Sequence, residues 1–278
     1  MKLIDFDGLF DEKLTQFMEE NKNKYTEKQW EDIIPRLYKK FGDTYVAKIK
    51  CTPKEYYAKM SDSELTEALC AHLSGDVPVP EFLCAEIEKR GAVETLLPLL
   101  NGKDTLSATY AVNLIGEDER AFESYFALLL NEGADEELKS DVVDIFKRHA
   151  DEIKEKALIA YQEGKGKEYM LEILSRVKAR EEEIFKTLLS AFLSGEETPM
   201  RASYLAAYGD ERALPYLLEK IEDKTIGFVE FQELKYAIEE LGGEYDEPRD
   251  FSDDKDYLAV EEATSKHTFS SGENERQS

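Results

Sequence analysis

The sequence predicts an all-α protein in which a helical region of about 90 residues precedes about five pairs of helices. Apolar residues recur three and four positions apart through most of the chain, as on one face of a helix. Helix-capping sequences stand before several of these stretches, and no stretch alternates convincingly between apolar and polar residues as a half-buried strand does. The paired pattern repeats from about residue 92 onward, which indicates a repeat protein.

The predicted first helices of the pairs begin 29 to 32 residues apart, and each is followed by a polar turn and a second apolar-periodic helix. These first helices begin near Ala92, Ala121, Ile153, Ile184 and Ala213. A single helix pair cannot bury its apolar face, so neighbouring pairs are expected to stack on a shared core.

The stretch Gly209–Asp223, GDERALPYLLEKIED, carries the clearest repeat signature. Glycine can close one helix and aspartate can cap the next, and Leu214, Leu217 and Ile221 then share one helical face. The stretch resembles the short, phycobilin-lyase-type form of the HEAT-like repeat family, whose unit ends in Gly-Asp and restarts with Ala-Leu-Pro-x-Leu. The family's usual arginine at the start of the second helix is met only approximately, by Arg201.

The resemblance covers about residues 92–243, with a looser match over residues 92–121 through LLPLL and GEDERAF. It implies a right-handed α-solenoid of HEAT-like helix pairs with an N-terminal helical cap. Three segments follow: a helical region at 1–90, the repeats at 91–243, and an acidic and polar tail at 244–278. The last dozen residues are polar and unpatterned, which predicts disorder.

Residues 1–90 lack the repeat but carry clear helix signals. Sequences beginning at Thr26, Thr52 and Ser61 each place Glu or Gln three positions later, as in a capping box. The run Val77-Pro78-Val79-Pro80 cannot be helical throughout, because each proline pushes the preceding residue toward extended geometry. It predicts a joint before the helix that leads into the repeats.

The charge balance favours a basic partner over nucleic acid. The formal net charge is −25, which repels phosphate backbones and attracts basic segments. Residues 22–59 are an exception, with ten Lys or Arg against five Asp or Glu. Aromatic residues interleave with these lysines and leave open a base-stacking surface, although several fit an apolar helix stripe. These aromatic residues are Tyr25, Trp30, Tyr38, Tyr45, Tyr56 and Tyr57.

The sequence predicts a cytoplasmic chain, because it has no apolar run of membrane-spanning length and no signal-peptide core at its N-terminus. Cys51, Cys70 and Cys84 form no CxxC pair, so we expect free cysteines that pack as small apolar residues.

No catalytic constellation is evident, and we predict no catalytic residue, cofactor or metal site. His72 and His149 lie near predicted helix ends, where a partly protonated imidazole suits the helix dipole. A calcium-loop spacing from Asp250 to Glu261 has Lys255 where the loop needs glycine. An enzyme built from distant residues stays an alternative, but the sequence favours a non-enzyme.

The sequence therefore predicts a non-catalytic interaction or scaffold module that binds a basic peptide or protein segment on a concave repeat surface. The second helices of the pairs are expected to face the partner, and Tyr and Arg make effective anchors. The candidate contact residues are Tyr110, Asn113, Arg201, Tyr204 and Tyr208. The alternative is a helical-repeat enzyme or nucleic-acid-modifying protein that acts through the basic aromatic stretch 22–59.

Overall fold

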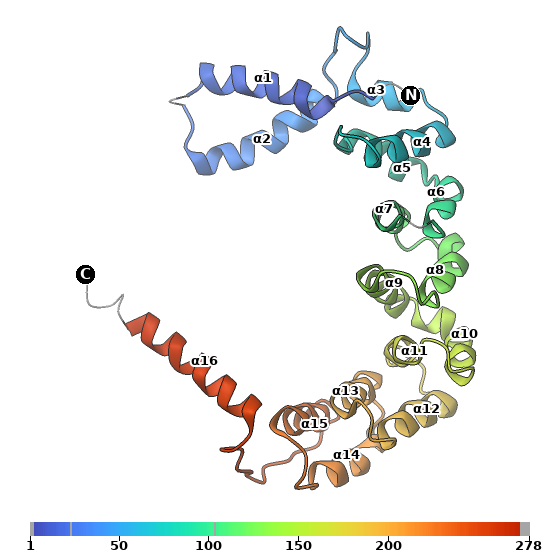
Figure 1. Cartoon of the computed structure of the whole chain (residues 1–278), viewed down its shortest axis with the longest axis vertical. Coiled ribbons are helices and arrows are strands. Elements are labelled where there is room, and N and C mark those ends of the chain that lie inside the picture. Colours follow the sequence, from blue (N-terminus) through green and yellow to red (C-terminus); the bar gives the residue numbers. More distant parts are fainter. Residues whose placement is uncertain (1–2, 23, 103, 273–278) are drawn as a thin grey trace. The chain divides into compact units, whose positions relative to one another are not determined.

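The computed structural model describes residues 3–22, 24–102 and 104–272, and across these residues it is all-helical without a β-strand (Figure 1). The predicted all-α class is therefore confirmed. The chain divides into two compact units, residues 1–142 and 143–278.

The helices of the first unit follow one another through short turns. They are α1 (Phe6–Glu20), α2 (Glu27–Phe41), α3 (Pro53–Ala58), α4 (Asp62–Leu73), α5 (Glu81–Arg90), α6 (Val93–Leu100), α7 (Thr105–Ile115), the 3-10 turn η1 (Glu119–Ala121), α8 (Phe122–Leu129) and the start of α9 (Glu136–Arg148). The predicted capping boxes begin α2, α3 and α4, where the side chains of Thr26, Thr52 and Ser61 each accept a backbone N–H.

The helical N-terminal region continues into the predicted repeat region without a break in packing. Helices α4 and α5 pack on each other and also contact α6 and α7. Leu65 and Leu69 of α4 and Leu83 and Ile87 of α5 are buried in this joint core. The segment boundary predicted near residue 90 thus lies inside one compact unit.

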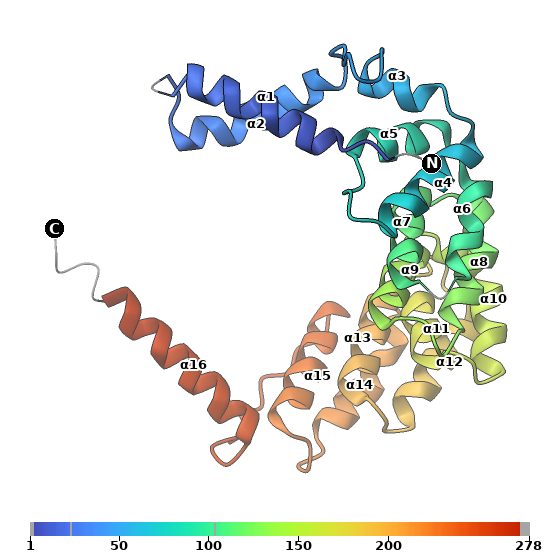
Figure 2. The ribbon, with the colours of Figure 1, turned by 45° about the horizontal axis from the view of Figure 1, so that its top comes forward.

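Helices α1 and α2 form a hairpin whose turn points away from α3–α7 (Figures 1 and 2). Its open end is fixed by aromatic residues. The Phe6 ring lies 5.7 Å from the Tyr57 ring and 6.4 Å from the Phe82 ring, both edge-on. The Tyr38 ring stacks on the Phe82 ring at 4.8 Å. These contacts join the hairpin to α3 and α5.

The second unit begins within α9 and contains the remaining helices. They are α10 (Ala150–Gln162), α11 (Lys167–Leu174), α12 (Glu182–Leu193), α13 (Thr198–Tyr208), the 3-10 turn η2 (Glu211–Ala213), α14 (Leu214–Ile221), α15 (Phe228–Glu240) and α16 (Lys255–Gly272). Helix α13 packs against α11, α12 and α15, so neighbours cover it on several sides. Ala202, Leu205 and Tyr208 of α13 are fully buried there.

The helices α6, α8, α10, α12 and α14 start within three residues of the predicted first helices of the pairs. The turns before α8 and α14 also share one local structure. In the first, Asp118 Oδ1 accepts the Arg120 backbone N–H at 3.0 Å and its Nε–H at 2.9 Å. In the second, Asp210 Oδ1 accepts the equivalent Arg212 groups at 3.1 and 3.0 Å. The Asp-Glu-Arg-Ala sequence thus folds in the same way at both turns.

We predict a pH-dependent contribution of Asp210 to stability. The hydrogen bond from Arg212 lowers the pKa of the Asp210 carboxyl, so the ionised form stabilises the fold above the unfolded-state pKa, near 3.9. Asp210→Asn should lower the free energy of unfolding by about 1 kcal/mol at pH 7, and the difference should shrink as pH falls below about 4. Urea unfolding at pH 7 and pH 3 measures this, with the exposed Asp246→Asn as control. A pH-independent difference would contradict the prediction.

The tail packs against α15 through residues just before α16 and in its first turn. The Phe251 ring lies 5.1 Å from the Phe231 ring, and the Tyr257 ring lies 5.2 Å from the Phe228 ring. Both aromatic residues thus pack on α15, whereas Leu258 and Val260 are exposed. Of the last dozen residues, predicted to be disordered, residues 267–272 continue α16 and residues 273–278 lie outside the described residues.

Candidate interaction surfaces

Two of the predicted contact residues lie on a partly exposed face of α7. Tyr110 is half-buried and Asn113 is exposed. Leu106 lies one turn before Tyr110 on the same face and is 50% exposed. This face of α7 is therefore open to contact, and Tyr110 and Asn113 stay predicted contact residues.

Arg201 is an interior residue, and its predicted role as a partner anchor needs correction. Its side chain is 7% exposed. Nη1 donates to the Ala191 carbonyl oxygen at 2.9 Å and to Ser194 Oγ at 2.7 Å, and Nη2 donates to Glu168 Oε1 at 2.5 Å. Arg201 therefore joins the end of α12 to α11 and α13. The bond to Glu168 also raises the pKa of the guanidinium, which stays charged.

Tyr204 and Tyr208 are likewise buried, so neither presents its ring to a partner. Burial raises the pKa of the Tyr204 hydroxyl. The Tyr208 hydroxyl accepts the Glu181 backbone N–H at 2.7 Å and lies 3.0 Å from the Ala179 carbonyl oxygen, to which it donates. Helix α13 is covered by three neighbouring helices, which explains why its tyrosines hold elements together.

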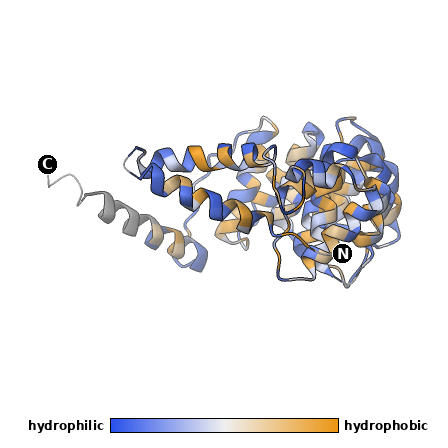
Figure 3. Ribbon diagram, turned by 90° about the horizontal axis from the view of Figure 1, so that it is seen from above, coloured by the Kyte–Doolittle hydropathy of each residue, from blue (hydrophilic) through white to orange (hydrophobic). Residues whose placement is uncertain are grey.

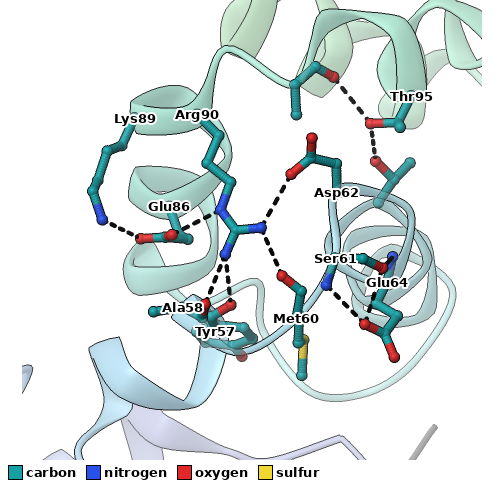
Figure 4. A network of polar contacts seen from close by, with 12 residues as sticks. Tyr57, Ala58, Met60, Ser61, Asp62, Glu64, Glu86, Lys89, Arg90 and Thr95 are labelled. Atoms are coloured by element: carbon teal, nitrogen blue, oxygen red, sulfur yellow. Dashed lines mark hydrogen bonds and ion pairs between the residues drawn. The ribbon is translucent and has the colours of Figure 1, made fainter.

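Other arginines also bind the carbonyl groups at the ends of short helices. Arg90 Nη1 donates to the Met60 carbonyl oxygen at 2.6 Å, and Nη2 donates to that of Ala58 at 3.0 Å, while Nε donates to Glu86 (Figure 4). In the second unit, Arg249 donates to the Ile221 and Asp223 carbonyl oxygens after α14. These guanidinium groups satisfy helix-end carbonyls that have no partner within the helix.

An acidic face of α15 was not among the predicted sites. Residues 230–256 hold eleven Asp or Glu against three Lys or Arg. Tyr236 lies in this segment and is 61% exposed. Val229, just before the segment and one heptad earlier on the same face, is 47% exposed. Glu233 and Glu240 fall on the same stripe by helical spacing. The sequence feature that could have indicated this face is the apolar pair Val229 and Tyr236, seven residues apart. The pair lies on a different side of the helix from the buried residues Phe231, Leu234 and Ile238.

Most aromatic residues of the basic stretch 22–59 are at least half-buried against other rings of the first unit. Tyr57 is buried, and Tyr38 donates to Asp7 Oδ1 at 2.5 Å. Trp30 packs edge-on against both Phe17 and Tyr25. Tyr45 is the prominently exposed member. An open base-stacking row, which the nucleic-acid alternative requires, is therefore not evident in this stretch.

A lysine-flanked cleft of about 180 Å³ lies on one side of the α1–α2 hairpin. Its lining residues are Phe10, Lys13, Leu14, Phe17, Leu37, Lys40, Phe41 and Thr44. Hydrophobic residues alternate with hydrophilic ones along these helices (Figure 3). A wider cleft, lined by Asp7, Asp11, Tyr38, Lys39 and Glu81 among others, lies on the other side. The residues that line the two clefts thus differ in the sign of their net charge.

The titratable groups that could support chemistry are engaged in structural contacts. His72 is buried with Nδ1 3.1 Å from the Val77 carbonyl oxygen. Cys51, Cys70 and Cys84 are free, and burial raises the pKa of the Cys84 thiol to about 11. Asp254 accepts the Phe228 backbone N–H at 3.0 Å, so it caps α15. Among the described residues, no group of His, Cys, Asp and Glu is arranged to hold a metal ion.

Comparison with known protein families, with curated proteins and with solved structures found no match. Within the described part of the chain, no helix has both the length and the apolar character that crossing a bilayer requires.

Proposed function

We propose that this chain is a non-catalytic interaction or scaffold module that binds a basic peptide or protein segment. The observation that carries the proposal is the α15 face, where exposed Val229 and Tyr236 share a stripe with Glu233 and Glu240 and the acidic segment 230–256 follows. An exposed tyrosine offers a large, rigid contact surface at low entropic cost. The surrounding carboxylates would attract a positively charged partner and exclude negatively charged ones.

We further propose that the helix pairs from α6 onward are HEAT-like repeats in a right-handed α-solenoid, with α1–α5 as its N-terminal cap. Support comes from the 29 to 32 residue period and from the equivalent turns at Asp118 and Asp210. Repeat proteins of this kind bind partners on the row of second helices, to which α15 belongs. An experimental structure in which successive pairs rotate in no constant sense would contradict this architecture.

The α15 face can be tested with a defined peptide. We expect a fluorescein-labelled 18-residue peptide of lysines and leucines, spaced as an amphipathic helix, to bind the full chain. Tyr236→Ala should weaken binding about tenfold, equal to about 1.4 kcal/mol, because it removes the main apolar anchor. Fluorescence anisotropy measures the dissociation constant. Binding should also weaken as salt rises, since salt screens charges beyond about 8 Å.

The matched control is Ile159→Ala, which truncates an equally exposed apolar residue on α10. It should leave binding of the basic peptide unchanged. A glutamate counterpart of the peptide and a single-stranded oligonucleotide complete the series, and Tyr236→Ala should change the affinity of the full chain for neither. Equal weakening by Tyr236→Ala and Ile159→Ala, or oligonucleotide binding tighter than peptide binding, would overturn the proposal.

A further inference from the structure

The α1–α2 hairpin leaves its apolar side chains incompletely covered. Phe41 is the only buried residue of α2, although Trp30, Ile33, Ile34 and Leu37 form an apolar stripe with it. In α1, burial is confined to Phe6 and Phe10 near its start. Two helices alone cannot enclose such a stripe, because each face between them needs a further layer. Among the described residues of the first unit, Phe82 of α5 supplies such a layer at the open end of the hairpin, against Tyr38 and Phe41. Leu14, Phe17 and Leu37, farther along, stay half exposed.

The lysine-flanked cleft has the dimensions of a pocket for one large side chain. Its volume is about 180 Å³, and a cavity of about 150 Å³ accommodates a benzene molecule. Phe10 and Phe41 are nearly inaccessible and lie deepest, while Leu14, Phe17 and Leu37 are half exposed. A leucine or phenylalanine from another helix would bury these walls.

The rim of this cleft is cationic. Lys13 and Lys40 are exposed, and Lys13 Nζ lies 5.1 Å from the centre of the Phe41 ring. No acidic residue lines the cleft. The chain segment that leads away from it, residues 36–54, holds six Lys or Arg against Asp43 alone. Asp43 itself is paired with Lys54 at 2.7 Å. In a chain of net charge −25, this is a local site of the opposite sign.

We propose that the lysine-flanked cleft binds an acidic amphipathic helix of a partner protein. One apolar side chain of that helix would enter the cleft between α1 and α2, and its flanking carboxylates would pair with Lys13 and Lys40. A helix fits because two antiparallel helices present a groove along their length, which a third helix completes. A bilayer surface fits less well, because it offers no protruding group to fill a concave site. The site is independent of α15 and takes a partner of opposite charge.

The test uses two labelled 18-residue peptides with the same leucine spacing, one carrying glutamates and the other lysines. Against the full chain with Tyr236→Ala, which weakens the α15 site about tenfold, the glutamate peptide should bind more tightly than the lysine peptide. Lys13→Glu with Lys40→Glu should weaken glutamate-peptide binding at least tenfold, and Leu14→Asp should weaken it by a similar factor. Lys39→Glu, on the opposite side of the hairpin, should leave it unchanged.

Circular dichroism tests whether each variant folds. Because Lys13 and Lys40 are exposed, their substitution should leave the fold intact, so this variant tests the cleft even if Leu14→Asp unfolds the hairpin. Equal binding of both peptides would overturn the proposal, as would equal effects of the Lys13/Lys40 and Lys39 variants. Vesicles rich in phosphatidylserine that bind more tightly than the peptide would assign the cleft to a lipid surface instead. Self-association that the Lys13/Lys40 variant abolishes, measured by sedimentation, would assign it to a second copy.

Discussion

Arg201→Ala is expected to lower the free energy of unfolding of the second unit by about 3 kcal/mol. The substitution removes hydrogen bonds to the Ala191 carbonyl and to Ser194, and it leaves Glu168 without its cation. Loss of one partner from a buried pair costs about 3 to 5 kcal/mol. Because the Glu168 side chain is 36% exposed, water can compensate it in part, and the lower end of that range applies.

Urea unfolding followed by circular dichroism measures the change, and hydrogen exchange localises it. Amides of α11, α12 and α13 should exchange faster in Arg201→Ala, because this guanidinium joins those three helices. The matched control is Arg176→Ala, an exposed arginine in the same unit, which should change stability by less than about 0.5 kcal/mol. Arg201→Lys should fall between them, since it keeps the charge and loses the planar fork. Equal stability of the two alanine variants would contradict the prediction.

The local helix signals were the part of the fold that the sequence could predict. Capping boxes at Thr26, Thr52 and Ser61 depend on residues three positions apart, so they can be read without tertiary information. The starts of the paired helices could be predicted in the same way, because the apolar periodicity and the Gly-Asp turns are also local sequence features. The two Asp-Glu-Arg-Ala turns support this point, because the same four residues starting at Asp118 and at Asp210 form the same hydrogen bonds.

The candidate site was less accessible to sequence reasoning, because exposure depends on how many neighbours a helix has. Arg201, Tyr204 and Tyr208 were predicted to face a partner, but α13 is packed against α11, α12 and α15. A helical period shows which residues share a face and not how many faces are covered. At α2 the apolar stripe likewise shows a shared face and not its burial, because the structure buries only Phe41 of that helix.

Val229 and Tyr236 show what the period can still reveal. They lie outside the buried stripe of α15, where packing within the helix pair does not require an apolar side chain. They are exposed because no described helix covers that side of α15. The periodicity of one helix cannot predict whether another helix covers it. The same limit applies to Lys13 and Lys40, whose cleft exists only because α1 and α2 pair.

The largest expected effect is that of Tyr208→Ala, about 4 kcal/mol of unfolding free energy. Tyr208 is fully buried, and truncation of a large aromatic residue in a core costs about 3 to 5 kcal/mol through lost contacts and the cavity left behind. The variant also loses the stacking of the Arg180 guanidinium on the ring, at 4.9 Å from the ring centre. Urea unfolding of the full chain measures the total.

Tyr208→Phe separates the hydroxyl from the ring. It should cost about 1 to 2 kcal/mol, because the Glu181 backbone N–H loses its acceptor while the cavity stays filled. Hydrogen exchange should show the Glu181 amide exchanging faster in this variant, with the amides within α13 little changed. Tyr216→Phe, at a tyrosine 38% exposed on α14, is the control and should have almost no effect. If Tyr208→Phe matched Tyr216→Phe while Tyr208→Ala remained costly, Tyr208 would act through volume alone. The hydroxyl would then not hold the segment that joins α11 to α12.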